Sequence, residues 1–219
     1  MNLGTAILDL LFPPKCPYCQ RILEQPRAPA CPDCQKKLPW LDGRAGERKV
    51  DFTRGCFSPL AYRGLVPDAV RRYKFRPVRA YATPFGVVMA QCLRDHLPGE
   101  VDLITWCPLS KKRLRERGFD QAELLAGEVG KACAVPVVGT LKKVKHTDPQ
   151  SDLEEDSARR ANARGAYFVL PNLDLNGQRI VLVDDVVTSG ATMSECAGLL
   201  QMAGAKEVYG LTLAQARRD

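Results

Sequence analysis

The chain has 219 residues, of which 45% are apolar and 26% are charged. Its formal net charge of +7 at pH 7 favours polyanionic partners, such as phosphorylated metabolites or nucleic acid. No apolar run approaches the length of about 18 residues that a membrane-spanning helix needs, so we expect a soluble protein without membrane insertion. The length allows one sizeable domain and a small appendage.

The N-terminal stretch, residues 1–14, predicts an amphipathic helix rather than an export signal. Leu3, Ile7 and Leu10 follow the spacing of one buried helical face, whereas the start lacks basic residues and Asp9 interrupts the apolar run. We therefore expect a cytoplasmic protein. In that compartment the nine cysteines need an explanation other than disulfide bonds.

Two C-x-x-C pairs stand close together in a turn-rich segment, and they supply the four cysteines Cys16, Cys19, Cys31 and Cys34. Two such pairs provide four thiolates for tetrahedral Zn²⁺, so we predict a structural zinc ribbon, with a redox pair or an iron–sulfur cluster as the alternatives. The other cysteines stand singly among apolar residues and are predicted to be small buried side chains: Cys56, Cys92, Cys107, Cys133 and Cys196.

The pattern of elements predicts an α/β fold. Residues 1–41 hold the N-terminal helix and the ribbon, residues 42–55 form a polar linker, and residues 56–219 form the larger domain. We expect strands or extended segments at 56–62, 101–109, 135–144, 166–170, 179–186 and 207–216, and helices at 66–75, 82–97, 118–133, 151–164 and 190–205. Strands that alternate with helices predict a largely parallel sheet.

The stretch VLVDDVVTSGAT, residues 181–192, carries the clearest chemical signal. The strand ends at Asp184 and Asp185, and a turn then leads into a helix through Thr188, Ser189, Gly190, Ala191 and Thr192. Ligands of a parallel sheet bind beyond the carboxyl ends of its strands, and a helix N-terminus offers free N–H donors to a phosphate. Two carboxylates are suited to vicinal ribose hydroxyls. The predicted ligand is therefore a ribose 5-phosphate.

Three other structures could contain a strand that ends in two aspartates. A response-regulator receiver needs more chain than the 34 residues that follow Asp185. A Walker B strand lacks its partner, because the sequence contains no G-x-x-x-x-G-K-[ST] motif. A core strand followed by a helix with Thr188 or Ser189 as its N-cap stays open, although it leaves the paired aspartates unexplained.

The same stretch resembles the phosphoribosyl pyrophosphate (PRPP) motif of type I phosphoribosyltransferases, and nearly the whole chain resembles the ComF family of bacterial proteins tied to DNA uptake. Besides the cysteine pairs, residues 107–126 (CPLSKKRLRERGFDQAELLA) and 146–169 carry the resemblance. It implies that Asp184 and Asp185 are the catalytic pair that holds the ribose, and that residues 188–192 hold the 5-phosphate. The implied pyrophosphate loop consists of Pro108, Leu109, Ser110 and Lys111. Two positions depart from the family pattern, since Cys107 replaces a valine-like residue and Asp120 replaces an asparagine.

A dense basic run overlaps this loop. Five cations, against the single acidic Glu116, suit a pyrophosphate or a nucleic-acid backbone, with a solvated helix face as the alternative. They are Lys111, Lys112, Arg113, Arg115 and Arg117. Tyr73 and Phe75 lie among other cations, and either base stacking or core packing would explain them. By the resemblance, residues 146–164 form a mobile loop over the site with Thr147, Gln150, Arg160 and Asn162 at matching positions, although a plain surface helix is also open.

Two functions follow from this sequence. In the first, the chain is an enzyme that transfers phosphoribose from PRPP, bound with Mg²⁺, to an unidentified acceptor. In the second, favoured by the resemblance, the domain senses PRPP or ribose 5-phosphate and handles single-stranded DNA, while the ribbon docks a partner such as a DNA-uptake helicase. Residues that would form a base-recognition hood are not evident.

Overall fold

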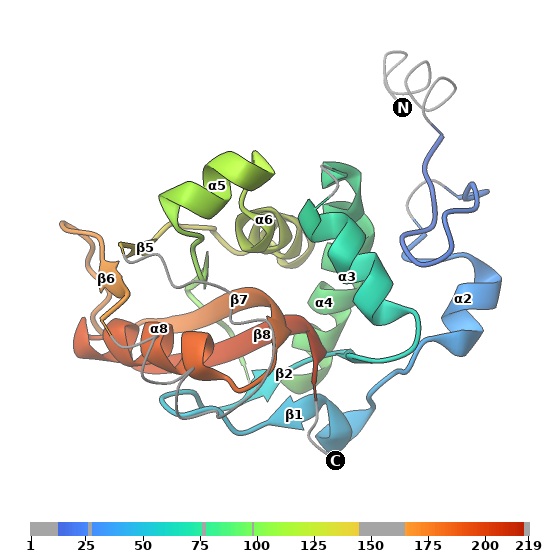
Figure 1. Cartoon of the computed structure of the whole chain (residues 1–219). Helices are drawn as coiled ribbons and strands as arrows, with labels where there is room; N and C mark the ends of the chain where they lie inside the picture. The colour runs from blue at the N-terminus through green and yellow to red at the C-terminus, as the bar shows by residue number, and fades with distance from the viewer. Residues whose placement is uncertain (1–12, 26–27, 76–77, 98, 145–164, 217–219) are drawn as a thin grey trace.

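The computed structural model describes residues 13–25, 28–75, 78–97, 99–144 and 165–216 (Figure 1). The helix predicted before Pro13 and the one predicted for residues 151–164 lie outside these residues. Among the described helices, none has the length and apolar character needed to cross a lipid bilayer.

A mostly parallel sheet forms the centre of the larger domain. Its strands follow the order β1-β2-β8-β7-β4, and β3 also pairs with β8. They span Glu47–Arg48 (β1), Cys56–Phe57 (β2), Leu60–Ala61 (β3), Leu103–Trp106 (β4), Arg179–Val187 (β7) and Glu207–Gln215 (β8). Only β1 pairs antiparallel in this sheet. The predicted fold class, a parallel-sheet α/β domain, is therefore confirmed.

Helices cover both faces of the sheet (Figure 1). On one face lie α3 (Val66–Phe75), α4 (Ala82–His96) and α6 (Gln121–Cys133), and on the other lies α8 (Ala191–Met202). The strand β7 shows why both faces are covered, because Val181 and Val183 pack into the first core whereas Ile180 and Leu182 pack into the second. Alternation with a period of two thus buries every one of these residues.

The structure differs from the predicted elements in three places. The strand expected at 56–62 is divided into β2 and β3, since Pro59 between them has no N–H for a sheet ladder. Of the extended segment 135–144, only β5 (Leu141–Lys143) is a strand, and it pairs antiparallel with β6 (Tyr167–Val169) in a separate two-stranded sheet. Within the predicted linker, β1 adds an edge strand to the main sheet.

The ribbon segment packs against α3 and α4. It contains the short helix α2 (Pro32–Lys37) and an antiparallel bridge between Lys15 and Ile22. From α3, Nη2 of Arg72 donates to the carbonyls of Pro17 (2.9 Å) and Tyr18 (2.8 Å). The ring of Tyr18 meets that of Phe85 on α4 edge to face, with 6.0 Å between centroids. The ribbon is therefore fixed to the helical face of the larger domain.

Candidate functional site

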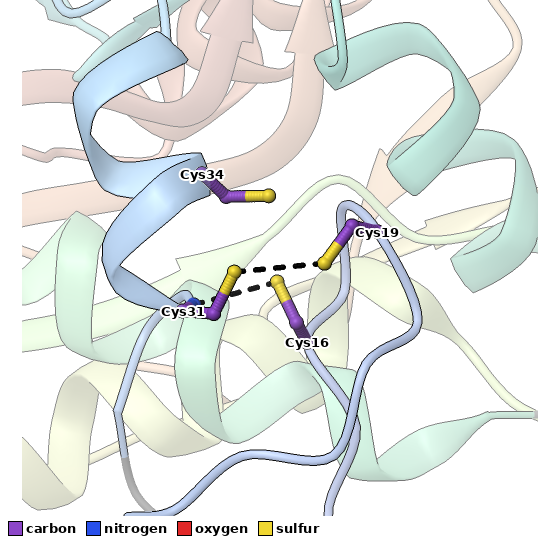
Figure 2. A group of neighbouring side chains, drawn as sticks. All are labelled: Cys16, Cys19, Cys31 and Cys34. Atoms are coloured by element: carbon purple, nitrogen blue, oxygen red, sulfur yellow. Dashed lines mark hydrogen bonds between the residues drawn. The ribbon is translucent and has the colours of Figure 1, made fainter.

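The four ribbon cysteines converge on one point (Figure 2). Cys16 and Cys19 come from the first turn, whereas Cys31 precedes α2 and Cys34 lies within it. Their sulfur atoms all lie within 4.8 Å of one another, and those of Cys19 and Cys31 are 3.5 Å apart. Tetrahedral zinc with Zn–S bonds of about 2.3 Å requires sulfur–sulfur separations of about 3.8 Å. The donor set and its spacing therefore fit a structural zinc ion.

The aspartate pair lies near the carboxyl end of β7. The strand runs two residues past the pair to Val187, so the predicted strand end was too early. Register places Trp106, the last residue of β4, opposite Val183, and the Cys107 N–H donates to the Val183 carbonyl at 2.9 Å. The loop that follows β4 thus begins next to Val183, the residue before Asp184.

The two aspartates have different surroundings. The Asp185 carboxylate forms an ion pair with Nζ of Lys74 at 2.8 Å, and Lys74 stands near the end of α3. Asp184 accepts the backbone N–H of Asp185 at 2.8 Å. The pKa of Asp184 is raised to about 7, mainly by burial and also by the charge of Asp185, while the charge of Lys74 lowers it. Near neutral pH, Asp184 therefore carries its proton part of the time.

The side-chain hydroxyls of the turn after β7 do not cap the helix α8 through the N-cap residue. Gly190, not Thr188 or Ser189, is the N-cap of α8, and its φ of 82° lies in the left-handed region that glycine favours. Ser189 Oγ accepts a long hydrogen bond of 3.4 Å from the Ala191 N–H. Thr192, predicted in the turn, belongs to the first turn of α8. The simple capped-helix interpretation therefore does not explain the hydroxyls of this segment.

The loop after β4 is anchored by Asp120. One oxygen of this buried carboxyl accepts the Leu109 N–H at 2.7 Å, and the other caps α6 by accepting the N–H groups of Ala122 (3.0 Å) and Glu123 (3.4 Å). Burial raises the pKa of Asp120 to about 6 against these hydrogen bonds. An asparagine offers one acceptor oxygen instead of two, which gives the departure from the family pattern a structural role.

The predicted basic run forms the helix α5 (Lys111–Arg117), with Ser110 as its N-cap. Lys111, Lys112 and Arg115 are exposed, whereas Arg113 and Arg117 are half-buried. Arg117 donates to Gln121 Oε1 at 2.8 Å, and its guanidinium lies 5.1 Å from the centroid of the Phe75 ring. Burial lowers the pKa of Arg117, while Asp185 opposes this shift. The helix thus carries three exposed cations and, in Arg117, a half-buried one whose charge interacts with that of Asp185.

Sequence reasoning missed two cations of this region. Lys74 stands between Tyr73 and Phe75, and Lys143 stands in β5, and no sequence motif assigns either of them to the site. Burial and the charge of Arg113 lower the pKa of Lys143, and Asp184 acts in the opposite direction. Both lysines reach the site through tertiary contacts that no local motif reveals. Tyr73 is a core residue whose hydroxyl donates to the Gln121 carbonyl, and Phe75 is 70% exposed.

Some predicted residues cannot be placed. Thr147, Gln150, Arg160 and Asn162 lie outside the described residues. Among the single cysteines, Cys133 is half-buried and the other four are buried, as predicted.

Comparison with known proteins agrees with this geometry. The sequence matches the family model of the double zinc ribbon domain over residues 7–48, and that of the phosphoribosyl transferase domain over residues 116–219. The fold and the cysteine cluster therefore define a type I phosphoribosyltransferase-like protein with an N-terminal zinc ribbon.

Two relatives identify the family. The chain is 36% identical over 198 residues to the DNA utilization protein YhgH of Salmonella typhi, which covers 88% of this chain and 80% of the relative. It is 30% identical over 153 residues to competence protein F of Haemophilus influenzae, covering 67% of this chain and 66% of the relative, just under two thirds of that protein's length. The chain belongs to the ComF family. Among solved structures, the purine phosphoribosyltransferase of Pyrococcus horikoshii aligns with 61% of this chain and 72% of its own, with 19% identity and a TM-score of 0.39.

Proposed function

We propose that the chain binds PRPP, or ribose 5-phosphate, at the carboxyl end of β7, and that it handles single-stranded DNA in the cytoplasm during natural competence. The observation that carries this proposal is the carboxylate pair that stands directly before a glycine-containing turn at a helix N-terminus. Asp184 and Asp185 are suited to the ribose hydroxyls, and residues 188–192 to the 5-phosphate. The link to DNA is supported by the names of the relatives, competence protein and DNA utilization protein.

The pyrophosphate of PRPP fits the region between the loop 108–111 and the half-buried cations of α5. Charge-assisted hydrogen bonds from Arg113 and Arg117 would stabilise this group, and Mg²⁺ bound with PRPP would neutralise much of its charge. The exposed Lys111, Lys112 and Arg115 would then remain for contact with a DNA backbone.

Calorimetric titration with Mg²⁺–PRPP tests the ribose assignment. Asp185→Asn preserves shape but removes a charge-assisted acceptor, so we expect affinity to fall roughly tenfold or more. Asp68→Asn, an exposed position on α3 paired with Arg71, serves as the matched control and should bind as wild type does. Wild-type binding of PRPP no tighter than that of inorganic phosphate would refute the ribose assignment.

Salt dependence tests the DNA assignment. Backbone contacts release counterions, so the logarithm of single-strand affinity falls by about 0.7 per neutralised phosphate for each unit of log salt. Lys112→Ala combined with Arg115→Ala, both at exposed positions of α5, should make the slope shallower by roughly one to two contacts. If slope and affinity do not change, the cations of α5 do not contact DNA and instead bind pyrophosphate or face solvent.

A second candidate is an active phosphoribosyltransferase. The observation that favours it is the charge interaction between Asp185 and the half-buried Arg117 of α5, because a cation near the aspartates would stabilise a leaving pyrophosphate. Incubation with PRPP, Mg²⁺ and a panel of bases decides between the two, because turnover releases pyrophosphate and binding alone does not.

The domain division at residues 41 and 56 and the ribbon's partner belong to the same proposal. We expect residues 1–41 to dock a protein such as a DNA-uptake helicase, since the ribbon lies apart from the aspartate pair. Substitutions on the ribbon surface should abolish capture of the helicase and leave PRPP binding unchanged. That result would support this division into domains.

A further inference from the structure

A second pocket adjoins the turn that follows β7. It has a volume of about 480 Å³, within the range of small-molecule sites. Its lining begins in the turn with Ser189, Gly190 and Ala191. Farther from the turn it is lined by Met202 at the end of α8, Tyr167 of β6 and Phe52, which precedes β2. Asp184 and Asp185 are not among the residues that line it. The pocket therefore adjoins the proposed phosphate position without being lined by the aspartate pair.

Phe52 provides a flat, supported ring in this pocket. A β-carbon at Gly198 would lie 3.3 Å from Cδ2 and 3.4 Å from Cγ of the ring, so one face of the ring rests on α8. The residue is nevertheless 57% exposed. Aromatic rings with one supported face and one open face are the usual platforms for nucleobase stacking.

The backbone holds Phe52 in an unfavourable conformation. Its φ of 63° is rare for a bulky residue and costs on the order of 1 kcal/mol or more. Gln201 Nε2 donates to the Phe52 carbonyl at 3.1 Å, and Val50 packs against Gly190, whose added β-carbon would lie 3.3 Å from Val50 Cγ2. The same short segment thus contacts the phosphate turn and presents the ring.

The charges of the pocket exclude a second phosphate as its occupant. Lys49 brings one positive charge, whereas Asp51 and Glu195 bring two negative ones. A neutral planar group with N–H donors suits this lining better than an anion. From Gly190 to Gly198 the helix rises about 12 Å, which a single nucleoside attached to the phosphate can span.

We propose that this pocket binds the nucleobase of the nucleotide that precedes the phosphate in the turn, so that the site accepts the 3′ end of a single-stranded nucleic acid. The proposal rests on the proposed function, because it assumes a ribose 5-phosphate beside the aspartates. The terminal sugar would occupy the aspartate pair, its phosphate the turn, and the preceding base the face of Phe52. Such a strand competes with PRPP for the same turn.

Two ligands that share one ribose 5-phosphate test the proposal by calorimetry: uridine 5′-monophosphate and the dinucleotide ApU, which adds adenosine beyond the phosphate. Phe52→Ala should weaken ApU binding about tenfold and change uridine monophosphate binding less than twofold. Phe52→Trp should retain ApU binding, and Trp40→Ala, which removes another exposed aromatic ring, should change neither affinity.

The outcomes separate the two proposals. If wild type binds uridine monophosphate and Phe52→Ala leaves ApU affinity unchanged, the pocket assignment is overturned while the proposed function stands. If wild type binds neither ligand nor PRPP, both are overturned. Replacing ApU by its deoxy counterpart distinguishes the source of the strand, because only a ribonucleotide end presents the vicinal diol to the aspartates.

Discussion

Replacing Lys74 by methionine removes the cation that faces the aspartate pair while keeping most of the side-chain volume. The Lys74 Nζ lies 2.8 Å from Asp185, and the two side chains are 23% and 12% exposed. At an effective dielectric constant of about 20, charges this close attract by about 6 kcal/mol, from which the desolvation of both groups is subtracted. Because the lysine keeps partial contact with water, we expect a net coupling of about 2 kcal/mol, between the values of surface and buried pairs.

The loss should depend on pH. Lys74 lowers the pKa of Asp184, so its removal raises that pKa above about 7, whereas the unfolded carboxyl titrates near 3.8. A carboxyl whose pKa is higher in the folded state loses stability as pH rises between the two values, because the unfolded chain ionises first. The Lys74→Met variant should therefore lose less stability at pH 6 than at pH 8.5.

Urea unfolding of four proteins measures this coupling: wild type, Lys74→Met, Asp185→Asn and the double variant. The double variant should recover much of the loss, because it leaves no unpaired charge on Asp185. A coupling below about 0.5 kcal/mol, or an equal loss at both pH values, would refute the account of the ion pair.

Three further predictions follow from the site. The purified protein should contain one zinc ion per chain by elemental analysis, and Cys19→Ser should lower that content and unfold the ribbon while sparing the larger domain; a visible iron–sulfur band would contradict this. The pKa of Asp184 is raised to about 7, and a ribose diol needs an ionised acceptor, so PRPP affinity should rise from pH 6 to pH 8. Binding near pH 7 should release a proton that the buffer takes up, and an affinity that does not change with pH in two buffers would contradict this role of Asp184. Asp120→Asn should cost about 1–3 kcal/mol in urea unfolding, because the Leu109 N–H loses its buried acceptor, and full stability would show that the acceptor is dispensable.

The sequence pattern predicted those helices and strands whose residues carry a clear local signal. The strand β7 and the helix α8 were predicted because apolar alternation, two aspartates and Gly190 follow one another within a dozen residues. The pairing of β5 with β6 was not predicted, since each strand has three residues and their partners are separated by a long segment. Short strands depend on tertiary pairing more than on their own composition.

The candidate site shows the same limit. Its aspartates, turn and loop were predicted from contiguous motifs, whereas Lys74 and Phe52 come from distant segments with unremarkable local sequence. Asp120 was noticed only as a departure from the family pattern, and its two-sided hydrogen bonding required coordinates. Motifs therefore indicate where a site is to be expected, and packing supplies the residues around it.

The helix α3 joins the two halves of the protein through neighbouring side chains. Arg72 holds the first cysteine turn of the ribbon, and Lys74, two residues later, pairs with Asp185. Because these two residues stand on one helical segment, a shift of α3 would alter the ribbon contact and the ion pair together. The position of the Lys74 ammonium beside Asp185 therefore depends on the same stretch of backbone that anchors the ribbon.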